Sequence, residues 1–204
     1  MIVIVDYGLG NVLAFANVYK TLNVAAAVAR QSDQLQGATK VILPGVGAFD
    51  HAMELLEKSG MRPALETLVL EQRVPVLGVC VGMQMLSAGS EEGDLPGLGW
   101  VKGRVVRLDS AHLPHATHLP HMGWNDVRSV CASPLFHGLE NNARFYFLHS
   151  YYFNCVQSTN VLAVARYGDE FCCAVGAENI YGVQFHPEKS HRFGMRLLKN
   201  FAEL

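Results

Sequence analysis

The chain has 204 residues, half of them apolar, and a formal net charge of −2. This length is enough for one compact domain with a sizeable hydrophobic core, and we expect residues 1–204 to form a single domain. The modest charged fraction argues against disorder. The slightly negative charge argues against nucleic acid or an anionic membrane as a partner.

We expect neither a targeting segment nor a membrane span. The apolar start at residues 1–6 lacks a basic lead-in and a small-residue cleavage site. The longest apolar stretch, residues 74–83, is too short to cross a bilayer. Five cysteines form an odd set without CxxC spacing, which is typical of reduced thiols in the cytoplasm rather than of disulfides or a zinc site.

The first half of the chain alternates short apolar runs with longer amphipathic stretches. The runs expected to form strands are residues 2–5, 24–29, 41–43 and 74–79. The stretches with helical spacing are residues 11–22 and residues 48–71, the second interrupted near Gly60 and Pro63. Such alternation of apolar strands with helices predicts an α/β fold with a parallel sheet covered on both faces.

The second half carries short, β-branched runs separated by turns. These runs are residues 103–108, 126–130, 144–148, 161–166, 171–175 and 180–183. We expect them to form mixed or antiparallel strands added to the parallel core. A helix over residues 195–201 closes the chain, and no internal repeat or linker divides it.

The most informative segment is Gly-Val-Cys-Val-Gly at residues 78–82, which follows a buried strand and precedes a helix. This is the sulfur form of the nucleophile elbow, a sharp turn whose glycines leave room where a Cβ would clash. We predict that Cys80 is a nucleophile, and that the start of the following helix favours its thiolate. A buried structural cysteine is the alternative, and the paired glycines argue against it.

A nucleophilic cysteine needs a general base and a group that orients the base. His186 and Glu188 stand on either side of Pro187. On an extended strand end, residues two apart face the same side, so Glu188 is expected to hold the imidazole of His186. Alone, this short run is a weak signal.

Taken together, six segments resemble the class I (triad-type) glutamine amidotransferases. They are residues 6–11, 43–49, 78–84, 120–125, 145–152 and 184–190. Within that family the whole chain is similar to the glutaminase subunits of the histidine-pathway enzyme imidazole glycerol phosphate synthase. The resemblance implies the three-layer, flavodoxin-like fold of the family and no cofactor.

The resemblance also implies roles for particular residues in the hydrolysis of L-glutamine to glutamate and ammonia. Cys80, His186 and Glu188 are the implied triad. Backbone amides of Val81, Val46 and Gly47 are the implied oxyanion hole. The implied glutamine contacts are Gln84, Glu92 (or its neighbour Glu91), His149, Ser150 and Tyr151.

A partner is implied as well, because family members pass ammonia to a (β/α)8-barrel cyclase subunit within a heterodimer. Asn11, Trp124 and Lys189 match positions at or near that interface. Residues 12–20 and 190–195 depart from the usual histidine-pathway pattern and look more like a related branch. Members of that branch supply ammonia to an amidotransferase of bacterial surface-sugar biosynthesis. The two acceptors remain open at this point.

Three other readings of the sequence compete with this one. A non-catalytic binding module on the same fold is disfavoured by the intact triad residues. A dinucleotide site at residues 8–13 is excluded because Leu13 occupies the third glycine position. His112, His115, His118 and His121 recur every third residue as metal ligands might, but prolines interrupt them, so we expect a polar loop without metal.

Overall fold

The computed structural model describes residues 1–112 and 118–204. Its first half is a parallel sheet whose strands are buried on both faces. The strands are β1 (Ile2–Val5), β2 (Ala26–Ala29), β3 (Lys40–Gly45) and β4 (Val76–Cys80). They lie in the order β2-β1-β3-β4, with β11 (Ile180–Val183) added in parallel beside β4. This doubly wound, flavodoxin-like order places ligand sites beyond the carboxyl ends of the strands.

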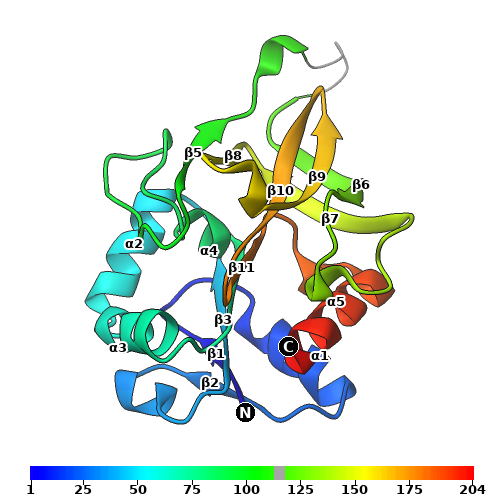
Figure 1. Cartoon of the computed structure of the whole chain (residues 1–204). Coiled ribbons are helices and arrows are strands. Elements are labelled where there is room, and N and C mark those ends of the chain that lie inside the picture. Colours follow the sequence, from blue (N-terminus) through cyan, green and yellow to red (C-terminus); the bar gives the residue numbers. More distant parts are fainter. Residues whose placement is uncertain (113–117) are drawn as a thin grey trace.

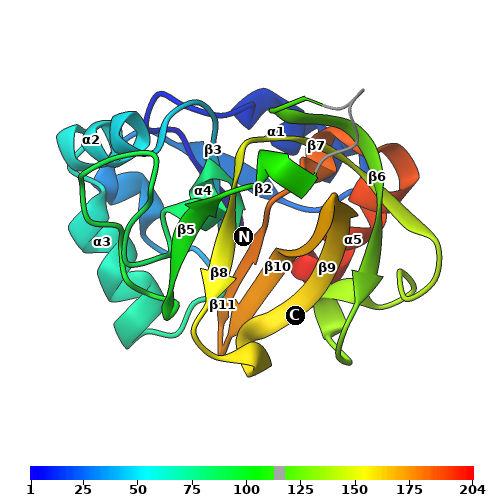
Figure 2. The same cartoon turned by 90° about the horizontal axis from the view of Figure 1, so that it is seen from above.

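Helices cover both faces of the sheet (Figures 1 and 2). On one side lie α2 (Phe49–Lys58) and α3 (Arg62–Glu66), and on the other α1 (Val12–Thr21) and α5 (His191–Glu203). The expected break near Gly60 is confirmed, because α2 ends at Lys58 and Gly60 has a φ of +67°. In the part of the chain that the structure describes, no helix has the length and apolarity to cross a membrane.

Antiparallel strands extend the sheet beyond β11, as expected. They are β10 (Asp169–Ala177), β9 (Val161–Tyr167), β6 (His121–Ser129) and β7 (Ala143–His149), in that order. A separate two-stranded sheet pairs β5 (Gly103–Arg107) with β8 (Tyr151–Cys155). The α/β class with a mostly parallel core and antiparallel additions is therefore confirmed.

Single turns connect several of these elements. They are η1 (Ser32–Leu35), η2 (Thr67–Glu71), α4 (Val81–Gln84), η3 (Ser110–His112), η4 (Pro134–Phe136), η5 (Ser158–Asn160) and η6 (Pro187–Lys189). Several expectations differ from the structure; the closing helix α5, for example, begins at His191 instead of residue 195. β6 begins at His121 instead of residue 126, and β8 was not predicted. Both gain their strand geometry from pairing with distant strands, which overrides local propensity.

Candidate active site

The nucleophile elbow is built from backbone-to-backbone contacts at the end of β4. Cys80 has a φ of 55°, a left-handed conformation that is rare for a residue with a side chain and is typical of a strained functional turn. A Cβ on Gly82 would lie 1.9 Å from the Leu43 carbonyl oxygen, and one on Gly78 would lie 2.6 Å from the Gly82 oxygen. Gly82 is thus required by the close approach of the turn to β3, and Gly78 by the way the turn folds back over the end of β4, as the sequence predicts for a crowded elbow.

The helix after the nucleophile is shorter than expected. α4 spans only Val81–Gln84 before the chain turns away. A single turn aligns few peptide dipoles, so it favours a thiolate less than a long helix does. The charge partner of Cys80 must therefore come mainly from elsewhere in the site.

That partner is His186, which lies in a buried hydrogen-bonded pair with Glu188. The His186 Nδ1 atom is 2.9 Å from Glu188 Oε1, and the two side chains are 3% and 2% exposed. Burial alone would lower the pKa of His186, but hydrogen bonds to Cys80 and Glu188 outweigh it and raise the pKa to about 10. The geometry therefore favours an imidazolium that faces the sulfur at neutral pH.

The backbone around His186 differs from the extended strand end that we expected. His186 itself is extended, but Pro187 starts the 3₁₀ turn η6 and Glu188 lies within it. The turn carries the carboxylate back to the imidazole. Ser190 closes it, because its Oγ donates to the His186 carbonyl (2.6 Å) and accepts from the Tyr146 amide (3.0 Å).

A cavity of about 300 Å³ opens beside Cys80. Its lining includes most of the site residues predicted from the sequence: Val46, Gly47, Cys80, Val81, Gln84, Glu92, His149, Ser150, His186 and Lys189. Pro120 and Leu148 also line it and were not predicted. Tyr151 and Glu188 stand behind this lining, where they orient Gln84 and His186.

The segment predicted to form part of an oxyanion hole runs directly beside the nucleophile. Gly45 pairs in register with Cys80, so Val46 and Gly47 follow next to Val81 at the cavity wall. Gly47 has a φ of +86°, a conformation that glycine adopts without strain. The backbones of two neighbouring strand ends thus border the cavity together, at the place where the sequence predicts an oxyanion hole.

The two candidate carboxylates for the ammonium group of glutamine point in different directions. Glu92 lines the cavity, and its Oε2 accepts from the Phe49 amide at 3.0 Å. Glu91 accepts from the Arg107 amide at 2.8 Å, outside the cavity lining. The geometry favours Glu92, the residue chosen from the sequence.

Gln184 contacts the nucleophile and was given no role from the sequence. Its side chain is fully buried, its Nε2 lies 3.8 Å from Cys80 Sγ, and its Oε1 accepts from Gln84 Nε2 at 3.1 Å. The signal was present, because Gln184 and His186 are two residues apart on the extension of β11 and so face the same side.

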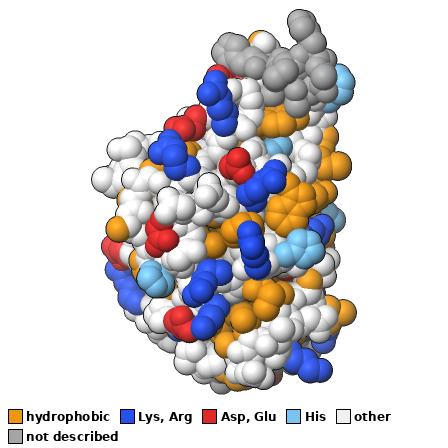
Figure 3. Space-filling model, turned by 90° about the vertical axis from the view of Figure 1, so that its right-hand side faces the viewer, with side chains coloured by type: hydrophobic (Ala, Val, Ile, Leu, Met, Phe, Trp, Pro, Cys, Tyr) orange, Lys and Arg blue, Asp and Glu red, His pale blue; other side chains and the backbone are white. Residues whose placement is uncertain are grey.

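Of the three predicted interface residues, only Lys189 lines this cavity. Trp124, 42% exposed, stacks on His191 with ring centroids 5.4 Å apart. Lys189 lines the cavity, and its Nζ is 5.8 Å from the centroid of the Tyr146 ring. Asn11 caps α1 on an exposed loop. The face formed by α1, α5 and the strands beside them mixes basic, acidic, histidine and hydrophobic side chains (Figure 3).

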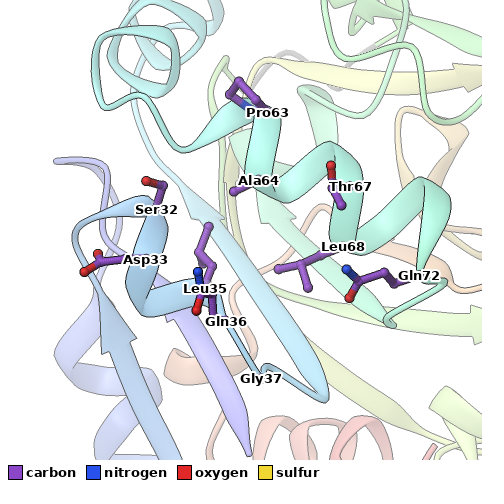
Figure 4. Close-up of a pocket in the computed structure, with 10 residues that line it drawn as sticks. All are labelled: Ser32, Asp33, Leu35, Gln36, Gly37, Pro63, Ala64, Thr67, Leu68 and Gln72. Carbon is purple, nitrogen blue, oxygen red and sulfur yellow. The ribbon is translucent and has the colours of Figure 1, made fainter.

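Two alternative sites gain no support. His115 and the side chain of His112 lie outside the described residues, and within the described part no group of three potential ligands could hold a metal ion. A larger cavity, about 630 Å³, lies between η1 and the α3–η2 region (Figure 4). Among its lining residues Asp33 is the sole titratable side chain, and the lining holds no cysteine, histidine or lysine.

Comparison with known proteins identifies the family of the chain. The family model described as "Glutamine amidotransferase class-I" matches residues 3–204, and the chain belongs to this family. It is 63% identical to "Imidazole glycerol phosphate synthase subunit HisH" of Bdellovibrio bacteriovorus and 50% identical to the protein of that name in Leptospira borgpetersenii. Both matches cover 100% of each chain.

A solved structure described as a glutamine amidotransferase shows the same fold at low sequence identity. Its TM-score is 0.75 at 21% identity, and the match covers 99% of both chains. The structure of PurLQS from Thermotoga maritima contains a similar chain, with a TM-score of 0.70 and 16% identity over 99% of this chain and 97% of that one. The expected class I glutamine amidotransferase fold is therefore confirmed.

Proposed function

We propose that the chain is the glutaminase subunit of an imidazole glycerol phosphate synthase. It hydrolyses L-glutamine and supplies the ammonia to a cyclase subunit in histidine biosynthesis. The observation that carries the chemistry is the buried Glu188–His186 pair facing Cys80 at a cavity. The full-length relatives named as subunits of this synthase support the choice of ammonia acceptor over the surface-sugar branch.

The reaction follows from the positions of these groups. The Cys80 thiolate attacks the side-chain amide carbon of glutamine, and amides of Val81 and of Val46 or Gly47 stabilise the oxyanion. The His186 imidazolium donates its proton to the departing nitrogen, which leaves as ammonia. Water, deprotonated by the now neutral His186, attacks the glutamyl thioester and releases glutamate and the thiolate.

The product explains why a partner is needed. Ammonia is protonated in neutral water and then ceases to be a nucleophile, so a direct route to the acceptor preserves its reactivity. Lys189 supports a route on this side, because it lines the catalytic cavity and also packs over Tyr146 beside Trp124. We propose that Asn11, Trp124 and Lys189 contact a (β/α)8-barrel cyclase.

The test is glutamine turnover by the purified chain, alone and with a cyclase barrel carrying its nucleotide ligand. We expect strong stimulation by the liganded cyclase, and no turnover by Cys80→Ala. Cys131→Ala, which removes an exposed cysteine, serves as the control and keeps full activity. Turnover that the cyclase leaves unchanged would overturn the assigned acceptor while retaining the glutaminase chemistry.

The proposed contact between Trp124 and the cyclase is tested separately, by binding measurements with a matched control. Trp124→Ala should weaken cyclase binding by about tenfold or more, as expected for an aromatic residue central to an interface. Val156→Ala removes another exposed hydrophobic side chain, 76% exposed, at the end of β8 and should bind like the wild type. Equal affinities for the wild type and both variants would exclude Trp124 from the interface.

A further inference from the structure

A buried chain of hydrogen bonds connects strand β6 with the catalytic cavity. Asn125 Nδ2 lies 3.2 Å from His121 Nε2, and His121 Nδ1 lies 3.0 Å from His149 Nε2. His149 Nδ1 in turn lies 2.8 Å from the Tyr151 carbonyl oxygen. The two histidines are 3% and 6% exposed, and His149 lines the cavity.

The direction of every bond in this chain is determined by the carbonyl groups at its ends. The Tyr151 oxygen can only accept, so His149 carries its proton on Nδ1 and offers Nε2 as an acceptor. His121 must then donate from Nδ1 and accept at Nε2. The Asn125 amide is fixed in the donating orientation because its Nδ2 also lies 2.8 Å from the Arg166 carbonyl oxygen.

The surroundings keep both imidazoles neutral, as this pattern requires. The ring of His121 is stacked against Phe147 and Tyr167, with centroids 4.7 and 4.1 Å apart. Burial lowers the pKa of His121 to about 4. Burial lowers the pKa of His149 to about 3, and a proton on the neighbouring His121 or His186 would oppose its protonation further.

The chain continues through the cavity wall to the nucleophile. The Tyr151 carbonyl oxygen that accepts from His149 also accepts from Gln84 Nε2 at 3.2 Å. The same Gln84 nitrogen lies 3.1 Å from Gln184 Oε1, and Gln184 Nε2 contacts Cys80 Sγ. Gln84, the residue expected to hold the amino-acid end of glutamine, is thus oriented by a carbonyl that His149 fixes.

We propose that His121 is a positioning residue: by donating to His149 Nε2 it acts with the Tyr151 carbonyl group to hold the Nδ1–H tautomer of His149, which orients the glutamine-binding wall of the cavity. This inference rests on the proposed glutaminase function. It also changes the role expected for His149. Both of its ring nitrogens are used within the protein, so its imidazole orients the Tyr151 carbonyl group instead of contacting glutamine.

Strand β6 also connects this chain of hydrogen bonds with the surface around Trp124, which is proposed to contact the cyclase. Side chains alternate along a strand, and here His121 and Asn125 face the cavity side while Met122 and Trp124 are exposed at 61% and 42%. A partner that contacts Met122 and Trp124 therefore touches the strand whose backbone also carries His121 and Asn125.

The experiment compares His121→Phe, which keeps an aromatic ring in the stack but removes the donor, with His121→Asn, which returns a nitrogen near the Nδ1 position. Tyr167→Phe is the matched control, because it keeps the ring stacked on His121 and loses only a hydroxyl that contacts the His118 carbonyl. The readouts are KM and kcat for glutamine in the cyclase complex, and ¹⁵N shifts of the His149 ring without substrate.

We expect His121→Phe to raise KM about tenfold or more with kcat changed little, since a buried acceptor is left unpartnered. The His149 ring should lose its pure Nδ1–H signature, and His121→Asn should restore both readouts. An Nε2–H tautomer of His149 in the wild type, or unchanged KM and ¹⁵N shifts in His121→Phe, would overturn the proposal. Wild-type protein without glutaminase activity would instead count against the proposed function, while the ring shifts would still test the tautomer.

Discussion

The proposed nucleophile and its proposed general base reach the cavity by different means. Cys80 is held by steric contacts, because the turn after β4 lies so close to β3 and to the end of β4 itself that Gly82 and Gly78 tolerate no Cβ. His186 is held by hydrogen bonds, with Ser190 and the Tyr146 backbone fixing the turn that follows it. Cys80 is therefore positioned by glycines that lack a side chain, whereas His186 is positioned by hydrogen bonds.

This difference predicts different responses to substitution. A steric constraint fails abruptly when an atom is added, and the whole elbow must move. A hydrogen-bonded turn loses its bonds one at a time, so its geometry degrades in steps. The substitutions below test each half against a matched position elsewhere in the chain.

Glu188→Gln should have the largest effect on activity. The amide cannot stabilise the His186 imidazolium or enforce its tautomer, so we expect turnover to fall by about two to four orders of magnitude. Glutamate release in the cyclase complex measures it. Glu178→Gln changes an exposed carboxylate, paired with Arg73, and should leave turnover unchanged. Near-normal turnover by Glu188→Gln would remove Glu188 from the triad.

Gly82→Ala should have the largest effect on folding. The new Cβ would lie 1.9 Å from the Leu43 oxygen, a contact that the backbone must relieve by moving. We expect a loss of about 1–3 kcal/mol or more in the free energy of unfolding, measured by urea titration. Gly89→Ala is the control, since its Cβ would meet the flexible Arg104 side chain at 3.4 Å and the Leu95 carbonyl oxygen at an ordinary contact distance of 3.7 Å. Equal stabilities would show that the elbow is not sterically fixed.

The pH dependence should expose the raised pKa of His186. Its proton is needed for ammonia to leave, so kcat/KM should stay level through neutral pH and fall about tenfold per pH unit above about 10. The stability that comes from protonating His186 is fully present below its ordinary pKa of 6.5 and is lost as pH rises through about 10. An NMR titration of His186 checks this, and a midpoint near 6.5 would contradict it.

Ser190→Ala should have the smallest effect and the most specific one. Losing the two bonds of its hydroxyl should cost about 1–3 kcal/mol of stability and lower turnover several-fold, because η6 can then drift. Ser59 at the end of α2 makes a similar pair of bonds, to the Leu56 oxygen and the Met61 amide. Ser59→Ala should lower the free energy of unfolding by a similar amount without changing turnover. A loss of turnover in Ser59→Ala would show that the effect of Ser190 is not specific to the turn η6.

The steric half of the site was predictable from local sequence, and the hydrogen-bonded half was predictable only in part. The strand, the two glycines and Cys80 form one continuous segment, so their geometry follows from the run itself. The turn at Glu188 depends on Tyr146, far away in sequence, and the extended backbone expected there was wrong.

The early start of β6 could not be predicted from the local sequence, for a similar reason. Its first residues include Gly123 and Asn125, which are uncommon in strands, and their pairing with β7 determines the conformation. The parallel core was easier, because strands buried on both faces are continuous apolar runs. Gln184 was visible in principle, two residues before His186, but a buried amide has no local pattern that distinguishes it.

The alternation along β6 also bears on how such a protein can change its partner. Met122 and Trp124 point outward, whereas His121 and Asn125 belong to the chain of hydrogen bonds that ends at the cavity beside Cys80. Evolution, or an engineer, can therefore replace the outward side chains to suit a different ammonia acceptor and leave the pocket intact. Insertion or deletion of one residue in this strand would instead exchange the two sets, which makes length far less variable here than composition.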